Sequence, residues 1–187
     1  MNYATNLSNM PTLAQRARVA ATVTTEYLRL TRKHDHWTSR TRPLLGEWAV
    51  RRWRALSYGT PERAELDESA YGDAAADLLH HATAAGYNAD VLCTLARGLY
   101  ATSDEQQPEP AAANAGEYAY VLAVLLADIY EAAERAGLPF GRVEWSARLH
   151  HDAEQAEATQ CQHGSGPREQ CTDCLIRDML ASSTVSG

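Results

Sequence analysis

The stretch that decides the fold is residues 69–102, which read SAYGDAAADLLHHATAAGYNADVLCTLARGLYAT. Apolar side chains recur at helical spacing over residues 71–82, and a second run of the same kind covers residues 92–99. Gly86 lies between the two runs, where helix ends favour glycine. The stretch therefore predicts a helical hairpin.

The same hairpin occurs a second time in the chain. The second copy covers residues 117–152, and a shift of 51 residues aligns three pairs of dipeptides in the two copies: Ala76-Asp77 with Ala127-Asp128, Ala85-Gly86 with Ala136-Gly137, and Ala96-Arg97 with Ala147-Arg148. Pro108 cannot continue a helix, so the acidic segment 103–115 is expected to separate the copies. Two tandem hairpins describe an architecture that is compatible with many functions.

The composition favours an all-α protein. Of the 187 residues, 45% are hydrophobic but only 7% are aromatic, and alanine is abundant. Strands prefer β-branched and aromatic residues, whereas alanine is the best helix former. The length suits one compact domain with a small module at one end.

Helical patterns also precede the two hairpins. Residues 1–10 are polar and expected to be disordered, and residues 11–57 are expected to form a basic helical pair. Its first helix covers about residues 12–33, and its second begins close to Pro43 after a polar loop. We expect this pair to form one bundle with residues 58–160.

Charge is divided unevenly along the chain. Residues 1–60 hold ten basic side chains against three acidic ones, a net charge of +7. Residues 61–187 hold seven basic against twenty-one acidic side chains, a net charge of −14. Opposite charges attract, so a basic N-terminal layer is expected to pack on an acidic bundle.

Nucleic-acid binding is the alternative interpretation of the basic segment. Trp48 and Trp53 alternate with three arginines that are candidates for phosphate contact: Arg51, Arg52 and Arg54. Aromatic rings stack on bases and arginines bind phosphates. However, buried tryptophan anchors beside a solvated charged face are commoner, and the polar loop before this helix is much longer than the turn of a helix-turn-helix motif.

The sequence suggests a location inside the cell. The first residues lack the apolar core of a signal peptide, and no run approaches the length of a membrane span. We therefore expect a cytoplasmic protein with no membrane partner. Lys33 is the only lysine among many arginines, which is typical of a GC-rich bacterial or phage genome.

A candidate zinc site lies near the C-terminus. Its four ligands are Cys161, His163, Cys171 and Cys174. Three thiolates and one imidazole form a closed tetrahedral set, which is typical of structural zinc. Residues 161–182 are thus expected to form a zinc knuckle and a short helix, followed by a flexible tail, 183–187. The alternatives are free thiols or an oxidised pair, and an intracellular location disfavours the latter.

Other reactive side chains are expected to be structural. Cys93 has no base beside it in the sequence and is interpreted as a small buried residue. Two adjacent pairs, His80-His81 and His150-His151, point about 100° apart on a helix, so neither pair can chelate one ion. One histidine from each pair could meet across the bundle, although we expect them at the solvent edge.

The pattern Asp73-x3-Asp77-Leu-Leu, followed by glycine and an Ala-Arg helix, resembles the all-α nucleotide pyrophosphohydrolases of the MazG type. In that family, Glu-x-x-Glu and Glu-x-x-Asp pairs hold magnesium, which positions a nucleoside triphosphate for attack by water. The resemblance places Asp77 and Asp128 at the last position of the second pair. Ala74 and Leu125 stand where its glutamates belong, which leaves magnesium short of ligands.

A second resemblance is to small helical proteins of actinobacteria and their phages that have no assigned activity. It rests on two segments, residues 76–80 (ADLLH) and residues 147–152 (ARLHHD). This resemblance implies a fold without an activity.

The sequence as a whole predicts a non-enzymatic interaction or regulatory protein with structural zinc and an unidentified protein partner. A nucleic-acid-binding accessory protein is the first alternative, and a degenerate nucleotide pyrophosphohydrolase is the second.

Overall fold

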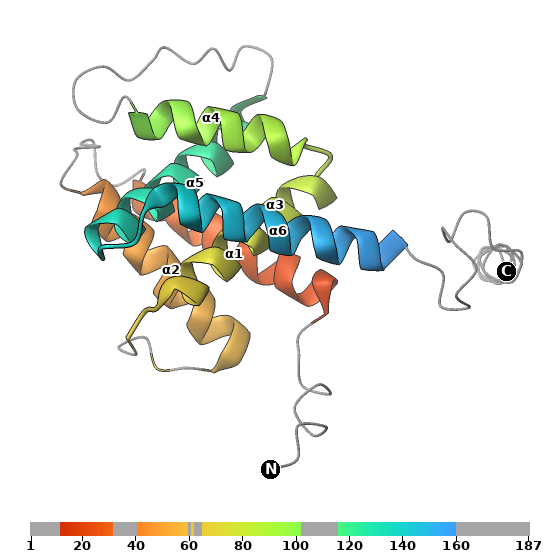
Figure 1. The fold of residues 1–187 in the computed structure, drawn as a ribbon, viewed down its shortest axis with the longest axis horizontal. Coiled ribbons are helices and arrows are strands. Elements are labelled where there is room, and N and C mark those ends of the chain that lie inside the picture. Colours follow the sequence, from red (N-terminus) through yellow and green to blue (C-terminus); the bar gives the residue numbers. More distant parts are fainter. Residues whose placement is uncertain (1–11, 32–40, 60, 62–64, 102–115, 160–187) are drawn as a thin grey trace, which may run out of the picture. The chain divides into compact units, whose positions relative to one another are not determined.

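The computed structural model describes residues 12–31, 41–59, 61, 65–101 and 116–159. These residues form six helices and no strand, so the all-α prediction is confirmed (Figure 1). The helices are α1 (Leu13–Thr31), α2 (Arg42–Tyr58), α3 (Glu68–Ala84), α4 (Ala89–Ala101), α5 (Gly116–Arg135) and α6 (Phe140–Thr159). The expected linker at 103–115 and the expected disordered N-terminus at 1–10 lie outside the described residues, as does the predicted zinc knuckle at 161–182.

The chain separates into two units, Met1–His151 and Asp152–Gly187. The first unit contains α1 to α5 and the first three turns of α6. All side-chain interactions described below belong to this unit.

The two repeated segments contain the same turn. Gly86 and Gly137 both have positive φ, of 86° and 85°, and they are related by the 51-residue shift. In both turns the next amide donates to a carbonyl five residues earlier: Tyr87 to Ala82, and Leu138 to Ala133, each at 2.9 Å. This is the hydrogen bond of a Schellman motif, which glycine stabilises because it has no Cβ.

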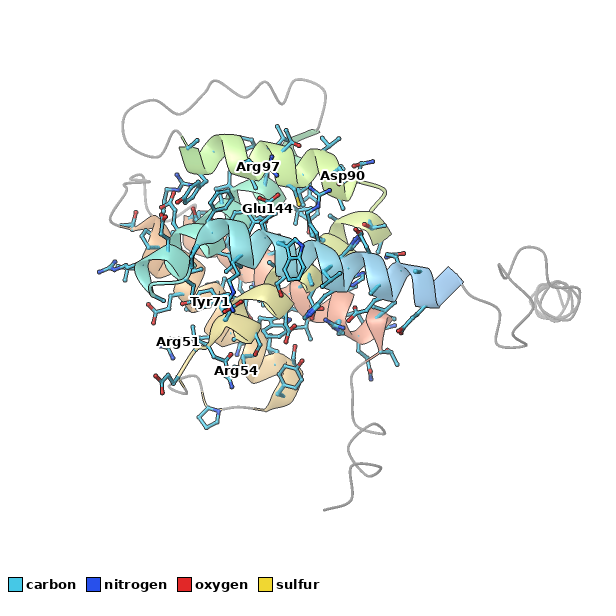
Figure 2. All side chains as sticks on the ribbon, in the orientation of Figure 1. Arg51, Arg54, Tyr71, Asp90, Arg97 and Glu144 are labelled. Carbon is cyan, nitrogen blue, oxygen red and sulfur yellow. The ribbon has the colours of Figure 1, made fainter. Side chains whose placement is uncertain are left out.

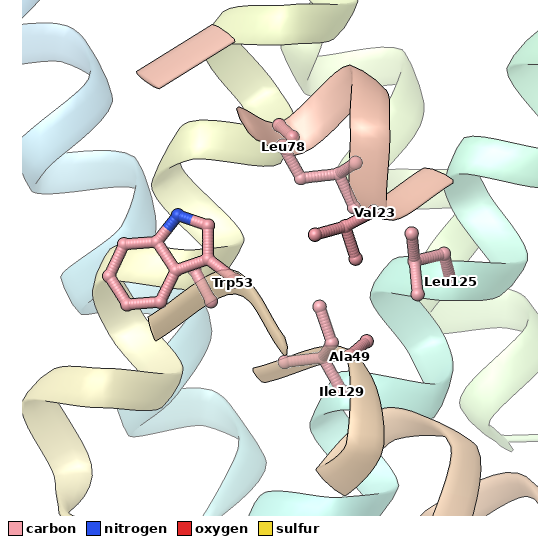
Figure 3. Close-up of a pocket in the computed structure, with 8 residues that line it drawn as sticks. Val23, Ala49, Trp53, Leu78, Leu125 and Ile129 are labelled. Atoms are coloured by element: carbon pink, nitrogen blue, oxygen red, sulfur yellow. The ribbon is translucent and has the colours of Figure 1, made fainter. Parts of the chain in front are cut away.

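Four helices, α1, α2, α3 and α5, form the centre of the fold, and each of them contacts the other three. An apolar cavity of about 10 Å³ lies among them (Figure 3). Each of these four helices contributes two lining residues: Ala20 and Val23 from α1, Ala49 and Trp53 from α2, Ala74 and Leu78 from α3, and Leu125 and Ile129 from α5. The last two pairs are again related by the 51-residue shift, so the repeat continues into the core.

The two repeated segments pack against each other. Helix α4 packs more extensively on α5 than on α3, its own neighbour in the sequence. Helix α6 also lies close to α3: a Cβ added to Gly72 would come within 2.8 Å of the Ser146 hydroxyl. The second helix of each copy thus contacts the first helix of the other copy.

The backbones of helices α2 and α5 approach each other closely at Gly46. A Cβ added to Gly46 would lie 1.9 Å from the carbonyl oxygen of Asp128. Only glycine permits this approach, because even an alanine would overlap the backbone of α5. The contact holds the start of α2 against the middle of α5.

None of the six described helices combines the length and the apolar composition that a membrane span requires.

Candidate functional site

Two aspartates lie at equivalent positions in the repeat and have no exposed surface. Asp77 lies on α3, and Asp128 lies on α5. A buried carboxylate is costly unless cations and hydrogen-bond donors compensate for lost water. Both aspartates receive such donors from the basic pair α1 and α2.

Asp77 accepts two hydrogen bonds from side chains of this pair. The Nε of Arg16 on α1 donates to Oδ1 at 2.5 Å. The indole Nε1 of Trp53 on α2 donates to Oδ2 at 2.7 Å. Trp53, which the sequence offered as a base-stacking residue, is therefore buried and bonded inside the bundle.

Asp128 also accepts hydrogen bonds from one arginine and one aromatic side chain, but here the arginine lies on α2 and the aromatic residue on α1. The Nε of Arg42 on α2 donates to Oδ1 at 2.8 Å, and the hydroxyl of Tyr27 on α1 donates to Oδ2 at 2.6 Å. Arg42 also forms an ion pair with Glu131 at 2.7 Å. Burial raises the pKa of Asp128 to about 6, although Arg42 and the bond from Tyr27 act in the opposite direction.

These contacts have an approximate two-fold symmetry. On α1, Arg16 precedes Tyr27 by eleven residues, and on α2, Arg42 precedes Trp53 by the same number. Eleven residues are about three helical turns, so each helix presents both side chains on one face. Each helix gives its arginine to one aspartate and its aromatic donor to the other. Sequence reasoning missed these four donors, although the shared spacing of eleven was a visible signal.

The two carboxylates are arranged to hold helices together. Both oxygens of each accept hydrogen bonds from α1 or α2. Ala74 and Leu125, which precede them by three residues, line the apolar cavity in Figure 3. Within the described residues, no three His, Cys, Asp or Glu side chains come together in a group suited to a metal ion.

Two of the four histidines on α3 and α6 are buried, although all four were expected at the solvent edge. His80 and His151 are buried and meet across α3 and α6, with ring centroids 4.7 Å apart. Their expected position at the solvent edge is therefore wrong, because α6 packs over α3. His81 bonds to Tyr118 at 2.8 Å, and His150 bonds to Asp73 at 2.9 Å.

Cys93 is buried on α4, as expected. Burial, with a smaller contribution from Glu144, raises the pKa of its thiol to about 11. A thiol with so high a pKa stays protonated at neutral pH and is a poor nucleophile. Glu144 itself pairs with Arg97 at 2.5 Å (Figure 2).

The three arginines offered for nucleic-acid binding lie along α2, and Figure 2 labels two of them, Arg51 and Arg54. Arg51 forms an ion pair with Glu47 at 2.8 Å, and Arg52 binds Glu26 on α1 at 2.8 Å. Arg54 donates to the carbonyl of Glu65 at 2.5 Å. All three guanidinium groups thus contact the protein itself.

The four predicted zinc ligands, Cys161, His163, Cys171 and Cys174, lie outside the described residues.

The outer face of α6 is a feature that the sequence interpretation missed. Trp145 is 65% exposed, and Leu149, one turn later, is 49% exposed. The 51-residue shift relates them to Thr94 and Gly98 on α4, which are also exposed. The repeat thus carries small residues at these positions in one copy and large apolar ones in the other. We define this outer face by Trp145 and Leu149.

The chain matches no protein-family model, and no curated protein or solved structure is significantly similar to it.

Proposed function

We propose that this protein is a non-enzymatic intracellular interaction or regulatory protein. The observation that carries the proposal is the exposed pair Trp145 and Leu149 on α6. Tryptophan is enriched at protein interfaces and often supplies a large share of their binding energy. The equivalent positions on α4, Thr94 and Gly98, indicate that the fold does not require large apolar side chains there.

The buried aspartates support the non-enzymatic part of the proposal. A hydrolase needs carboxylates that reach a metal ion or a substrate. Asp77 and Asp128 have no exposed surface and are bonded to Arg16 and Arg42. A guanidinium beside each carboxylate occupies the place and supplies the charge that a metal ion would otherwise provide.

A structural zinc ion is part of the same proposal. The support is chemical: Cys161, His163, Cys171 and Cys174 form a complete ligand set of the type that holds structural zinc. Four protein ligands leave no open position for a substrate. The ion would therefore order the C-terminal segment without taking part in a reaction.

Nucleic-acid binding through α2 is the second candidate function. It is favoured by the partial exposure of Arg51 and Arg52, whose side chains are 30% and 31% exposed. Their ion pairs with Glu47 and Glu26 weaken this candidate, because phosphate contacts would have to replace them.

Two experiments test the first proposal. Purified protein with magnesium is expected to release no pyrophosphate or phosphate from nucleoside triphosphates. Turnover that disappears in Asp77→Asn would instead establish a hydrolase.

In the second experiment, binding partners are recovered from the native host with the parent protein, with the Trp145→Glu variant and with the Thr94→Glu variant. Only Trp145→Glu is expected to lose them, because Thr94 is the symmetry-related control.

A further inference from the structure

We propose that Arg142, Trp145 and Leu149 on α6 form a docking surface for an acidic amphipathic helix of another protein. This inference rests on the proposed interaction function and states the chemistry of the partner. All three residues belong to the unit Met1–His151. They follow one another at steps of three and four residues, which places them on one face of α6.

The tandem repeat indicates that the fold does not require these side chains. The 51-residue shift relates the docking surface to three residues of α4: Val91, Thr94 and Gly98. These residues are also exposed, but none of them is charged or aromatic. Helix α4 thus takes the corresponding place in the first copy without the cation, the indole ring and the leucine. The docking surface therefore belongs to one copy and is better explained by contact with a partner than by folding.

Arg142 supplies a cation that an incoming carboxylate can reach. Its side chain is 66% exposed, and its ion partner Glu68 on α3, at 2.5 Å, is 32% exposed. Glu68 contacts Nε of the guanidinium, whereas the remaining N–H donors lie at the other end, on Nη1 and Nη2. That end has the geometry to bind both oxygens of a carboxylate. Exposed ion pairs contribute little, so a second carboxylate can bind beside Glu68 at small cost.

The seam between α4 and α6 adds a second cation beside Trp145. Arg97 on α4 pairs with Glu144 at 2.5 Å, and Figure 2 shows both residues between the two helices. The arginine is 51% exposed and the glutamate only 7%, so the cation faces solvent and the acid faces the interior. Arg148 also lies at this seam, where the exposed Asp90 neutralises it. Two outward-facing cations, Arg97 on the side of α4 and Arg142 on the side of α3, thus flank the indole.

This arrangement favours an acidic helix over other partners. Cations beside an apolar centre attract carboxylates and repel basic segments. Trp145 and Leu149 are one turn apart, so apolar residues at i and i+3 or i+4 of a second helix can pack on both. Carboxylates on the flanks of that helix then lie near Arg142 and Arg97. The result is an apolar core with a charged rim, the usual arrangement of a protein interface.

The test is a selection of random peptides, about four helical turns long, displayed on phage and bound to the full chain. The selected peptides are expected to be acidic, with apolar residues three or four positions apart. A synthetic peptide of the selected sequence is expected to bind Trp145→Ala at least about thirtyfold more weakly than the parent, as truncation of a hot spot does. Thr94→Ala, at the equivalent position on α4, is expected to bind it as the parent does.

A double-mutant cycle identifies the charge contact. Each carboxylate of the peptide is replaced in turn with the corresponding amide. Arg142→Gln is expected to weaken binding of the unmodified peptide about three- to tenfold at low salt, and one of the amide peptides is expected to show no further loss with this variant. Arg18→Gln removes an exposed arginine of α1 and serves as the control, with no expected change in affinity.

Three results would overturn the proposal. The first is a set of selected peptides that is neutral or basic. The second is an acidic peptide that binds Trp145→Ala as tightly as the parent. The third is a selection that returns no peptide. Sedimentation equilibrium and co-sedimentation with phosphatidylserine vesicles would then show whether a second copy or a lipid surface binds there instead. If Trp145→Glu still loses partners from the native host, the interaction function stands and only the class of partner changes, so the two failures are distinguishable.

Discussion

The carboxylate of Asp128 is stable in the bundle interior because Arg42 and Tyr27 donate hydrogen bonds to it. These bonds do not fully replace the water that was lost, and the pKa rises from 3.8 to about 6. The folded chain therefore holds this proton more tightly than the unfolded chain. The contribution of this group to stability is present in full below the unfolded pKa and is lost as the pH rises through about 6.

The first prediction follows from this pH dependence and compares the parent protein with the Asp128→Asn variant. The free energy of unfolding of the parent, relative to the variant, is expected to increase as the pH falls from 7 to 4. The full change is on the order of 3 kcal/mol at 1.36 kcal/mol per pKa unit. Urea titrations at several pH values measure it. A constant difference across this range would contradict a raised pKa at Asp128.

The second prediction compares two glycines in helices. A Cβ on Gly46 would overlap the carbonyl of Asp128, whereas a Cβ on Gly98 meets no atom within 4 Å. Gly46→Ala is expected to destabilise the protein by about 1–3 kcal/mol or more, because α2 and α5 must move apart. Gly98→Ala is expected to stabilise it by up to about 1 kcal/mol through helix propensity. Equal effects in thermal unfolding would contradict the close approach of α2 and α5.

At the level of helices, α2 has two faces with different partners. One face holds Trp53 and Arg42 against the aspartates, and the other carries arginines that bind acidic and carbonyl groups nearby. The acids that neutralise these arginines lie on α1 and on α2 itself. The positive charge of residues 1–60 is thus partly compensated within the basic pair.

The third prediction concerns nucleic acid. Because Arg51, Arg52 and Arg54 contact the protein, binding to random duplex is expected to be no tighter than about micromolar at physiological salt. Replacing all three with glutamine is expected to change this affinity little. Much tighter binding that falls steeply with salt, and that the triple variant loses, would establish the nucleic-acid function instead.

The fourth prediction concerns the C-terminal segment that follows α6. Alkylation with mass spectrometry is expected to find slow reaction of all four cysteines in the zinc-loaded protein. After chelation, Cys161, Cys171 and Cys174 are expected to react, while the buried Cys93 stays protected until the helices unfold. Most of the helical signal is expected to survive chelation, because the hydrophobic core that the helices share lies within residues 23–147. Reduced protein without zinc, or a Cys171→Ser variant with full zinc content, would refute the site.

At the level of the whole molecule, both buried carboxylates depend on the basic pair, helices α1 and α2. Helices α1 and α2 supply both cations and both aromatic donors that compensate Asp77 and Asp128. They also supply half of the residues around the central cavity. Without this pair, α3 and α5 would keep two carboxylates in an apolar surrounding with no ion partner from α1 or α2.

The fifth prediction follows from this dependence. A chain that lacks residues 1–59 is expected to lose cooperative thermal unfolding and near-ultraviolet dichroism, since buried carboxylates without their cations are strongly destabilising. A chain that lacks only residues 1–11, all of them before α1, serves as the control and is expected to unfold as the parent does. Cooperative unfolding of the chain that lacks residues 1–59 would show that the tandem repeat folds without the basic pair.

The sequence alone was sufficient to predict the local structure. The expected helix at 12–33 is α1 (Leu13–Thr31), and the expected start near Pro43 is that of α2 (Arg42–Tyr58). Gly86 and Gly137 end helices as predicted. These features depend on side chains three or four residues apart and on the conformational freedom of single glycines, both of which can be seen in a short window of sequence.

The partners of the buried charges were decided by the tertiary structure. Arg16 and Asp77 are 61 residues apart in the chain, and Arg42 and Asp128 are 86 residues apart. Charge patterning predicted attraction between the halves, but many acids in residues 61–187 could have satisfied it. The sequence offered Trp53 as a buried anchor or a base-stacking residue, and neither interpretation specified Asp77 as its hydrogen-bond acceptor. Only the packing of α1 and α2 on α3 and α5 selects these pairs, because burial makes one carboxylate dependent on a cation while leaving its neighbours in water.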